Sequence, residues 1–184
     1  MKKELIYILS GGVFTIILLT IIFKKRRQII SFMLNKEQEY FISDLHEIAK
    51  SKFIDFIAKT QAKGYRVIIT TGYRSFENQA ELKKQNSKNA SPGLSMHNYG
   101  LAIDINLQRG TELWRKADTK AKWEQTGIPQ MAKNMGLFWG GDFKNYHDPV
   151  HFEIDKDGSK LLAQAKKQFG DNPYKIKGNQ VLIT

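Results

Sequence analysis

Residues 95–107 have the sequence SMHNYGLAIDINL, which indicates most about the fold. From residue 101 onward, large apolar side chains alternate with small or polar ones, which include Ala102 and Asp104. An alternation with a period of two is typical of a β-strand that has one face in a hydrophobic core. We therefore expect Asp104 to project from the opposite face, where the small side chain of Ala102 leaves room beside it.

A second alternation begins at residue 148 with the sequence DPVHFEI. Its apolar positions are 150, 152 and 154, so His151 and Glu153 are expected on the other face of a second strand. Before the first strand, Gly100 allows the backbone to bend, so that the imidazole of His97 can approach Asp104. If the two strands lie side by side, His97, Asp104 and His151 converge on one point.

Two imidazoles and one carboxylate supply three corners of a tetrahedral metal site. A catalytic zinc site has three protein ligands of this type, an open fourth position and a nearby base. Asp148, three residues before the last ligand, is the expected base. We therefore expect one Zn²⁺ held by His97, Asp104 and His151. Taken singly, each stretch also fits a structural role, a hydrogen-bonded histidine or an aspartate that faces water, but together they favour the metal site.

The other histidines offer one competing metal site. His147 and His151 form an HxxxH pair, the spacing of zinc ligands on a helix. Pro149 lies between them and would remove a helical hydrogen bond, and on a strand the two would lie about 13 Å apart. We therefore expect His147 in a loop, and His46 on the surface of a charged amphipathic helix.

Composition limits the function classes that the chain can serve. The 184 residues fit one domain with an appended segment, and the absence of cysteine excludes disulfides and a cysteine nucleophile. A net charge of +11 suits an anionic polymer, either cell wall or nucleic acid, but a merely solvated basic surface is the favoured account. Aromatic residues are not interleaved with the basic ones in a nucleic-acid-binding motif, so nucleic acid is not an expected partner.

The N-terminal region is expected to anchor the chain in a membrane. Residues 5–23 carry no charge, and as a helix they would span about 28 Å, close to the ~30 Å hydrocarbon core of a bilayer. The basic run at residues 24–27 follows directly, where a signal peptide would have small residues at a cleavage site. We expect an uncleaved, single-pass anchor.

The pattern Ser-x-His-x-x-Gly-x-Ala-x-Asp followed by Asp-x-x-His resembles that of the zinc peptidases of bacterial cell walls, the group that joins lysostaphin-like, D-Ala-D-Ala-cleaving and hedgehog-like domains. The flanking stretches ITTGYRS (69–75) and GLFWGGDF (136–143) look like the L-alanyl-D-glutamate peptidase branch, which includes phage endolysins and is VanY-like, of peptidase family M15. The D-Ala-D-Ala carboxypeptidase branch typically has a glutamate base and a tryptophan before the last histidine, where this chain has Asp148 and Val150. The resemblance covers about residues 43–155.

The resemblance implies a role for each candidate residue. Asp148 would act as general acid and base, and Arg74 would neutralise either the developing oxyanion or a substrate carboxylate. Ser95 would bind substrate or orient the ligand loop. Gln79 and Glu153 are expected to support these groups from behind.

The expected fold is α+β, with a small, mainly antiparallel sheet and helices packed on one side of it, preceded by one N-terminal transmembrane helix. Helices are predicted from Asn35 to Lys63, over 76–85, and over 120–135 with an interruption near 127–129; residues 67–71 are a strand and 85–94 a polar loop. The predicted organisation is an anchor with basic flanks (1–27), a juxtamembrane linker (28–42), a zinc peptidase domain (43–157) and a C-terminal tail (158–184) with a helix over 159–169.

The resemblance implies a peptidase that hydrolyses peptidoglycan stem peptides, with the L-Ala–D-Glu bond as first choice. A D-Ala-D-Ala carboxypeptidase or dipeptidase on the same scaffold is an alternative, and so is a non-catalytic zinc-containing module that binds the wall; the presence of Asp148 counts against the latter. We expect the domain to face the periplasm or wall, where the substrate lies. One signal opposes this orientation, because the four cations at 24–27 outnumber those before the anchor, which favours a cytoplasmic domain.

Overall fold

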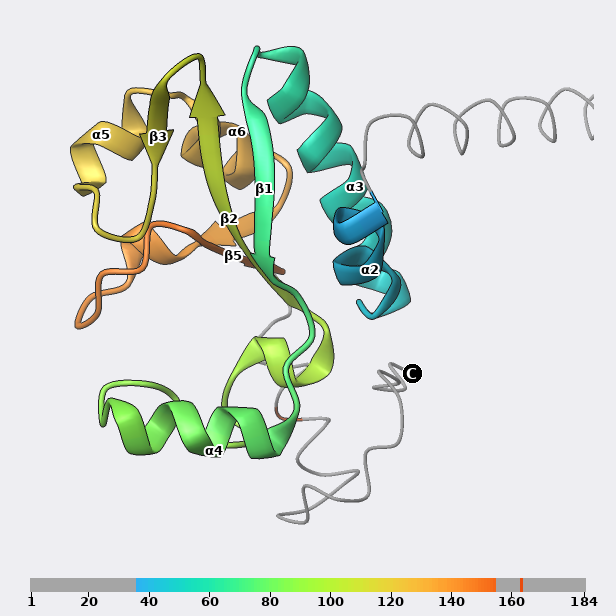
Figure 1. Ribbon diagram of the computed structural model, residues 1–184, viewed down its shortest axis with the longest axis vertical. Coiled ribbons are helices and arrows are strands. Elements are labelled where there is room, and N and C mark those ends of the chain that lie inside the picture. The colour runs from blue at the N-terminus through green and yellow to red at the C-terminus, as the bar shows by residue number, and fades with distance from the viewer. Residues whose placement is uncertain (1–35, 155–162, 164–184) are drawn as a thin grey trace, which may run out of the picture. The chain divides into compact units, whose positions relative to one another are not determined.

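The computed structural model describes residues 36–154 and Ala163 (Figure 1). The predicted anchor (1–27) lies outside the described residues, and so do the first part of the predicted linker and, apart from Ala163, the predicted C-terminal tail with its helix. Among the helices that are described, none is long and apolar enough to cross a membrane.

The described strands form one antiparallel sheet, as the sequence predicts. β1 (Arg66–Thr71), β2 (Ala102–Arg109), β5 (His151–Ile154) and β4 (Leu137–Trp139) lie in that order, and β3 (Glu112–Trp114) pairs with β2 as a hairpin. β2 is central because it pairs with β1 on one side and with both β3 and β5 on the other. The two strands that were expected to lie side by side, β2 and β5, are therefore direct neighbours.

The apolar faces of β2 and β5 are covered by helices. Phe152 of β5 contacts Phe56 of α3 (Glu47–Ala62), with ring centroids 4.9 Å apart, and Trp123 of α5 (Lys120–Glu124), at 6.3 Å. Both helices thus pack on the same sheet face, and α6 (Ile128–Asn134) contacts β4. Figure 1 shows α3 running beside β1, whereas α4 (Phe76–Gln85) lies beyond one end of the sheet. The helix layer leaves the other sheet face, which carries Asp104 and His151, free to build a site.

The predicted helix from Asn35 to Lys63 is two helices, α2 (Lys36–Ser43) and α3. His46, expected on a helix surface, is instead the N-cap of α3: its Nδ1 accepts a hydrogen bond from the Ile48 amide at 3.2 Å, and the residue is only 8% exposed. That prediction is wrong because a new helix starts at this point. Ile48, in the first turn of α3, is 43% exposed.

α2 belongs to the same compact unit as the sheet. The Gln38 side-chain amide donates a hydrogen bond to the Val67 carbonyl of β1, and Ile42 is buried. The compact unit that contains the sheet begins at Glu37.

Gly100 makes the turn that joins the first histidine to β2. It ends the short 3-10 helix η1 (Met96–Tyr99) with a positive φ of 66°. A Cβ at this position would lie 2.6 Å from the backbone nitrogen of His46, and the Gly100 carbonyl accepts a hydrogen bond from that nitrogen at 3.0 Å. Glycine is therefore needed both for the left-handed turn and for the close approach of the α2–α3 connection.

Candidate metal centre and active-site pocket

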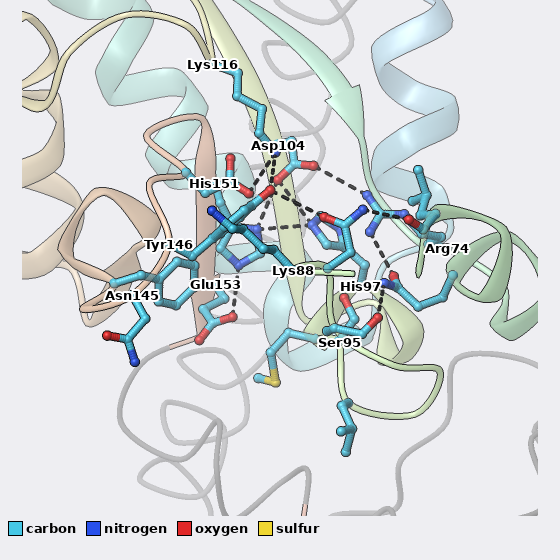
Figure 2. Close-up of a pocket in the computed structure, with 18 of the residues that line it drawn as sticks. Arg74, Lys88, Ser95, His97, Asp104, Lys116, Asn145, Tyr146, His151 and Glu153 are labelled. Atoms are coloured by element: carbon cyan, nitrogen blue, oxygen red, sulfur yellow. Dashed lines mark hydrogen bonds and ion pairs between the residues drawn. The ribbon is translucent and has the colours of Figure 1, made fainter. Parts of the chain in front are cut away.

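Three predicted ligand side chains meet at one point of the structure (Figure 2). His97 Nε2 lies 3.1 Å from both Asp104 Oδ1 and His151 Nδ1, and His151 Nδ1 lies 3.0 Å from Asp104 Oδ1. The sheet register explains the convergence, since Asp104 of β2 stands directly opposite His151 of β5. η1 then brings His97 to the same end of β2. These three atoms form a nearly equilateral triangle of nitrogen and oxygen donors.

The outer nitrogen of each imidazole faces an acceptor. His97 Nδ1 lies 2.7 Å from the Gly72 carbonyl oxygen, and His151 Nε2 lies 2.9 Å from Glu153 Oε2. A carbonyl or carboxylate oxygen accepts, so these outer nitrogens carry the hydrogens and the inner nitrogens offer lone pairs to the cluster. Two inward lone pairs beside a carboxylate fit a bound cation, and the donor set is one that zinc prefers.

The electrostatics of the cluster also favour positive charge at its centre. Burial alone would raise the pKa of Asp104, but the charge of His97 and hydrogen bonds from both imidazoles hold that pKa well below its usual range. Burial alone would lower the pKa of His151, but hydrogen bonds to Asp104 and Glu153 raise it to about 10. The groups that stabilise a proton on His151 would therefore also stabilise a bound cation.

The cluster lies in the wall of a pocket of about 680 Å³. All eight side chains that the sequence singled out as metal, catalytic or supporting residues line it: Arg74, Gln79, Ser95, His97, Asp104, Asp148, His151 and Glu153. By contrast, His147 lies in an exposed loop, as predicted, and its Nε2 is 2.9 Å from the Asp118 carbonyl oxygen. The HxxxH pair is therefore not assembled.

Arg74 is held against the cluster from the α4 side. Its Nη1 donates to Gln79 Oε1 at 2.9 Å, and its Nη2 lies 3.5 Å from Asp104 Oδ2. Gln79 is buried and its amide nitrogen donates to the Ala90 carbonyl at 2.7 Å, which fixes it in turn. Ser95 is largely buried at the start of η1, where its side chain makes no capping hydrogen bond to that helix.

Asp148 stands beside the cluster and outside the ligand triangle. Its Oδ2 lies 3.2 Å from Lys116 Nζ, whereas its Oδ1 is buried and has no hydrogen-bond partner among the described residues. An unpaired buried oxygen is costly in a folded protein, and this one is available to a bound group. The two oxygens of this carboxylate are therefore not equivalent.

Sequence reasoning missed several residues of the site. Lys116 is one, because its contact to Asp148 joins positions 32 residues apart and no local pattern indicates it. Gly140 is another: a Cβ there would lie 2.5 Å from the Asp148 carbonyl oxygen and 2.8 Å from the His151 Cβ. Gly140 lies within the stretch 136–143, and no local pattern there indicates its close approach to Asp148 and His151.

Comparison with known proteins shows which proteins the chain is similar to. A family model described as D-alanyl-D-alanine carboxypeptidase matches residues 88–154. The chain is 39% identical over 126 residues to the peptidoglycan L-alanyl-D-glutamate endopeptidase CwlK of Bacillus subtilis (strain 168). The matched region covers 61% of this chain and 74% of CwlK.

Two solved structures are also similar. The L-Ala D-Glu endopeptidase ChiX of Serratia marcescens has a TM-score of 0.51 and 19% identity, over 69% of this chain and 92% of ChiX, which shows a shared fold. A mutant of the vancomycin resistance D,D-pentapeptidase VanY, in complex with Zn(II), has a TM-score of 0.47 and 20% identity, over 66% of this chain and 79% of that one.

Proposed function

We propose that this chain, which belongs to peptidase family M15, is a zinc-dependent endopeptidase. The proposed reaction is hydrolysis of the L-Ala–D-Glu bond of peptidoglycan stem peptides. The observation that carries the proposal is the triangle of His97, Asp104 and His151, which lies beside a carboxylate with one oxygen that has no partner among the described residues. The choice of bond is supported by the likeness to CwlK, whose name states that activity.

His97, Asp104 and His151 would hold one Zn²⁺ through Nε2, Oδ1 and Nδ1. When bound, zinc supplies Lewis acidity, which polarises the scissile carbonyl and makes the attacking water more acidic. Glu153 and the Gly72 carbonyl would fix the two imidazoles through their outer nitrogens, which keeps the inner lone pairs aimed at the centre.

Asp148 would move the proton. Its Oδ1, which has no partner among the described residues, accepts the proton of the attacking water and then delivers it to the leaving amine of D-Glu. General acid–base catalysis of this kind contributes typically ~10²–10⁴-fold. Arg74 would stabilise negative charge on the substrate, either the oxyanion or a carboxylate, from the position where Gln79 holds it. Ser95, which also lines the pocket, would bind the substrate or orient the ligand loop.

A D-Ala-D-Ala carboxypeptidase is a second candidate, because the matching family model carries that description. The same ligands and base would serve either reaction, so the two differ only in which bond the pocket places over the cluster. A non-catalytic wall-binding module is less well supported, because it would not require a base such as Asp148, whose Oδ1 has no partner among the described residues.

We also propose that residues 1–27 anchor the chain in the membrane, with the peptidase domain facing the wall. The uncharged stretch 5–23 supports an anchor, and the substrate lies outside the cytoplasm.

Purified cell wall incubated with the full chain tests the proposed enzyme class. We expect solubilisation of stem peptides by the zinc-loaded chain, loss of that activity after chelation, and its return when zinc alone is added back. Activity that survives removal of all metal would exclude the proposed function. A parallel assay for free D-alanine separates the second candidate, for which D-alanine would be the product.

A further inference from the structure

We propose that Lys116 is a positioning residue that holds the Asp148 carboxylate in the orientation for proton transfer, and that Tyr146 and Asn89 hold Lys116 in place. The inference rests on the proposed peptidase function, because it concerns the base of that reaction. It adds residues from two further segments of the chain to the working part of the site.

The contact of Lys116 with Asp148 joins an exposed side chain to a largely buried one. Lys116 Nζ lies 3.2 Å from Asp148 Oδ2, and the two side chains are 57% and 14% exposed, respectively. Lys116 follows β3, so the hairpin of β2 and β3 brings the Lys116 ammonium to the pocket. Figure 2 shows the Lys116 side chain extending into the pocket. Burial alone would lower the pKa of Lys116, but the Tyr146 hydroxyl and Asp148 raise that pKa above its usual value, so the ammonium stays charged at neutral pH.

The ammonium makes the two oxygens of Asp148 unequal. A carboxylate turns easily about its last bond, since that torsion is broad and two-fold. With Oδ2 bound to Lys116, the other oxygen, Oδ1, is the one without a partner among the described residues and the one left to take a proton. Misplacement of a reacting group by about 1 Å costs on the order of 10²-fold in rate, so an untethered Asp148 would be a poorer base.

Lys116 is in turn held by a row of hydrogen bonds across the pocket. Its ammonium donates to the Tyr146 hydroxyl at 2.9 Å and lies 5.1 Å from the centre of that ring. The Tyr146 hydroxyl donates to Asn89 Oδ1 at 3.3 Å. Asn89 is fixed by the Leu82 carbonyl of α4, to which its amide donates at 2.8 Å, and by Lys83, which donates to its backbone oxygen at 2.8 Å. The row therefore ties Asp148 to the segment that follows α4.

A surface ion pair without a catalytic role is the alternative. An exposed pair of this kind is worth little, and its loss would leave turnover unchanged. Lys84 supplies the matched control, because it forms an ion pair with Glu81 at 2.7 Å on the surface of α4 and does not line the pocket.

The test uses the zinc-loaded full chain and a soluble muropeptide. For Lys116→Met we expect kcat to fall about 10- to 100-fold, with KM within about twofold and with zinc content and melting temperature unchanged, because only the base is misplaced. Lys116→Arg should recover part of the loss. Tyr146→Phe should lower kcat less than Lys116→Met, and Lys84→Met should match the wild type.

A double-mutant cycle distinguishes positioning from an independent effect. Once Asp148→Asn has removed the base, adding Lys116→Met should cause no further loss of kcat, because the lysine acts only through Asp148. A wild-type kcat in Lys116→Met, a loss of zinc in that variant, or a loss that multiplies in the double variant would overturn the inference while the wild-type chain remains active. An inactive wild-type chain would instead overturn the proposed function, and the inference with it.

Discussion

Each histidine of the cluster makes one outer and two inner contacts, and these contacts decide which residues can be exchanged. His97 and His151 turn their outer nitrogens to fixed acceptors and their inner nitrogens to Asp104. His147 is only four positions from His151, yet its ring contacts the Asp118 backbone. The three histidines therefore give a direct test of the ligand set.

Replacement of either cluster histidine by alanine should abolish zinc binding and activity. We expect His97→Ala and His151→Ala to fall from about one zinc per chain to almost none, because two remaining ligands are too few for a structural or catalytic zinc site. His147→Ala is the control and should keep its zinc. Elemental analysis of the purified variants measures this, and loss of zinc in His147→Ala would revive the HxxxH pair.

Replacement of Asp148 should separate chemistry from metal binding. We expect Asp148→Ala to retain zinc and melting temperature but to lose turnover by at least about 10²-fold, because the role proposed for it is proton transfer. Steady-state kinetics and zinc content on the same sample make the comparison. If the variant loses its zinc, Asp148 is a ligand and the base must be sought elsewhere.

For single residues, the sequence predicted the side-chain directions that follow from local periodicity. The alternation in 101–107 and 150–154 assigns Asp104 and His151 to matching strand faces, and the register places them opposite each other. Lys116 and Tyr146 could not be predicted in the same way, because their contacts depend on how the β2–β3 hairpin meets two distant loops. The position of His46 was predicted wrongly because the start of α3, which His46 caps, has no local signal in the sequence.

At the scale of elements, β2 and β5 carry two of the three ligands, Asp104 and His151, and η1 carries the third, His97. The short 3-10 helix η2 (Gly140–Asp142) packs against β5. The backbone of η2 approaches Asp148 and His151 closely, since the Gly140 carbonyl accepts a hydrogen bond from the Asp148 amide at 3.4 Å. This approach gives a physical reason for one glycine of the stretch 136–143.

A methyl group at Gly140 should therefore disturb the base and the last ligand together. It would lie 2.5 Å from the Asp148 carbonyl oxygen, so the backbone must shift, and we expect Gly140→Ala to lower both zinc affinity and kcat. Gly110→Ala is the comparison: its φ is +58° and nothing lies within 4 Å, so it should cost only about 1–2 kcal/mol of stability. Zinc titration and thermal unfolding of the two variants check this, and equal behaviour would mean that η2 does not position the site.

Element boundaries followed the sequence where a local signal marks them. Helix α4 occupies the predicted residues, with Ser75 as its N-cap, and the predicted interruption of the helix over 120–135 falls at Gly127, which has a positive φ. The division between α2 and α3 was not predicted, because it depends on a tertiary contact, the hydrogen bond from the His46 amide to the Gly100 carbonyl. The helical periodicity of apolar residues across the break predicts one continuous helix.

At the scale of the whole molecule, the position of the domain relative to the membrane decides whether it can reach its substrate. If residues 1–27 anchor the chain and the domain acts on the wall, as proposed, the peptidase domain lies outside the cytoplasmic membrane. Protease added to intact spheroplasts that express the full chain should then degrade the domain while a cytoplasmic marker survives. Complete protection of both proteins would place the domain inside, in agreement with the positive-inside tendency of residues 24–27.

The masses of the peptides that the zinc-loaded chain releases from intact peptidoglycan show whether the L-Ala–D-Glu bond is cleaved. We expect stem peptides that begin with a free amino group on D-Glu, together with glycan that retains L-Ala on its lactyl group. The His151→Ala variant should release neither. Free D-alanine as the sole product, or an unchanged wall, would contradict the account.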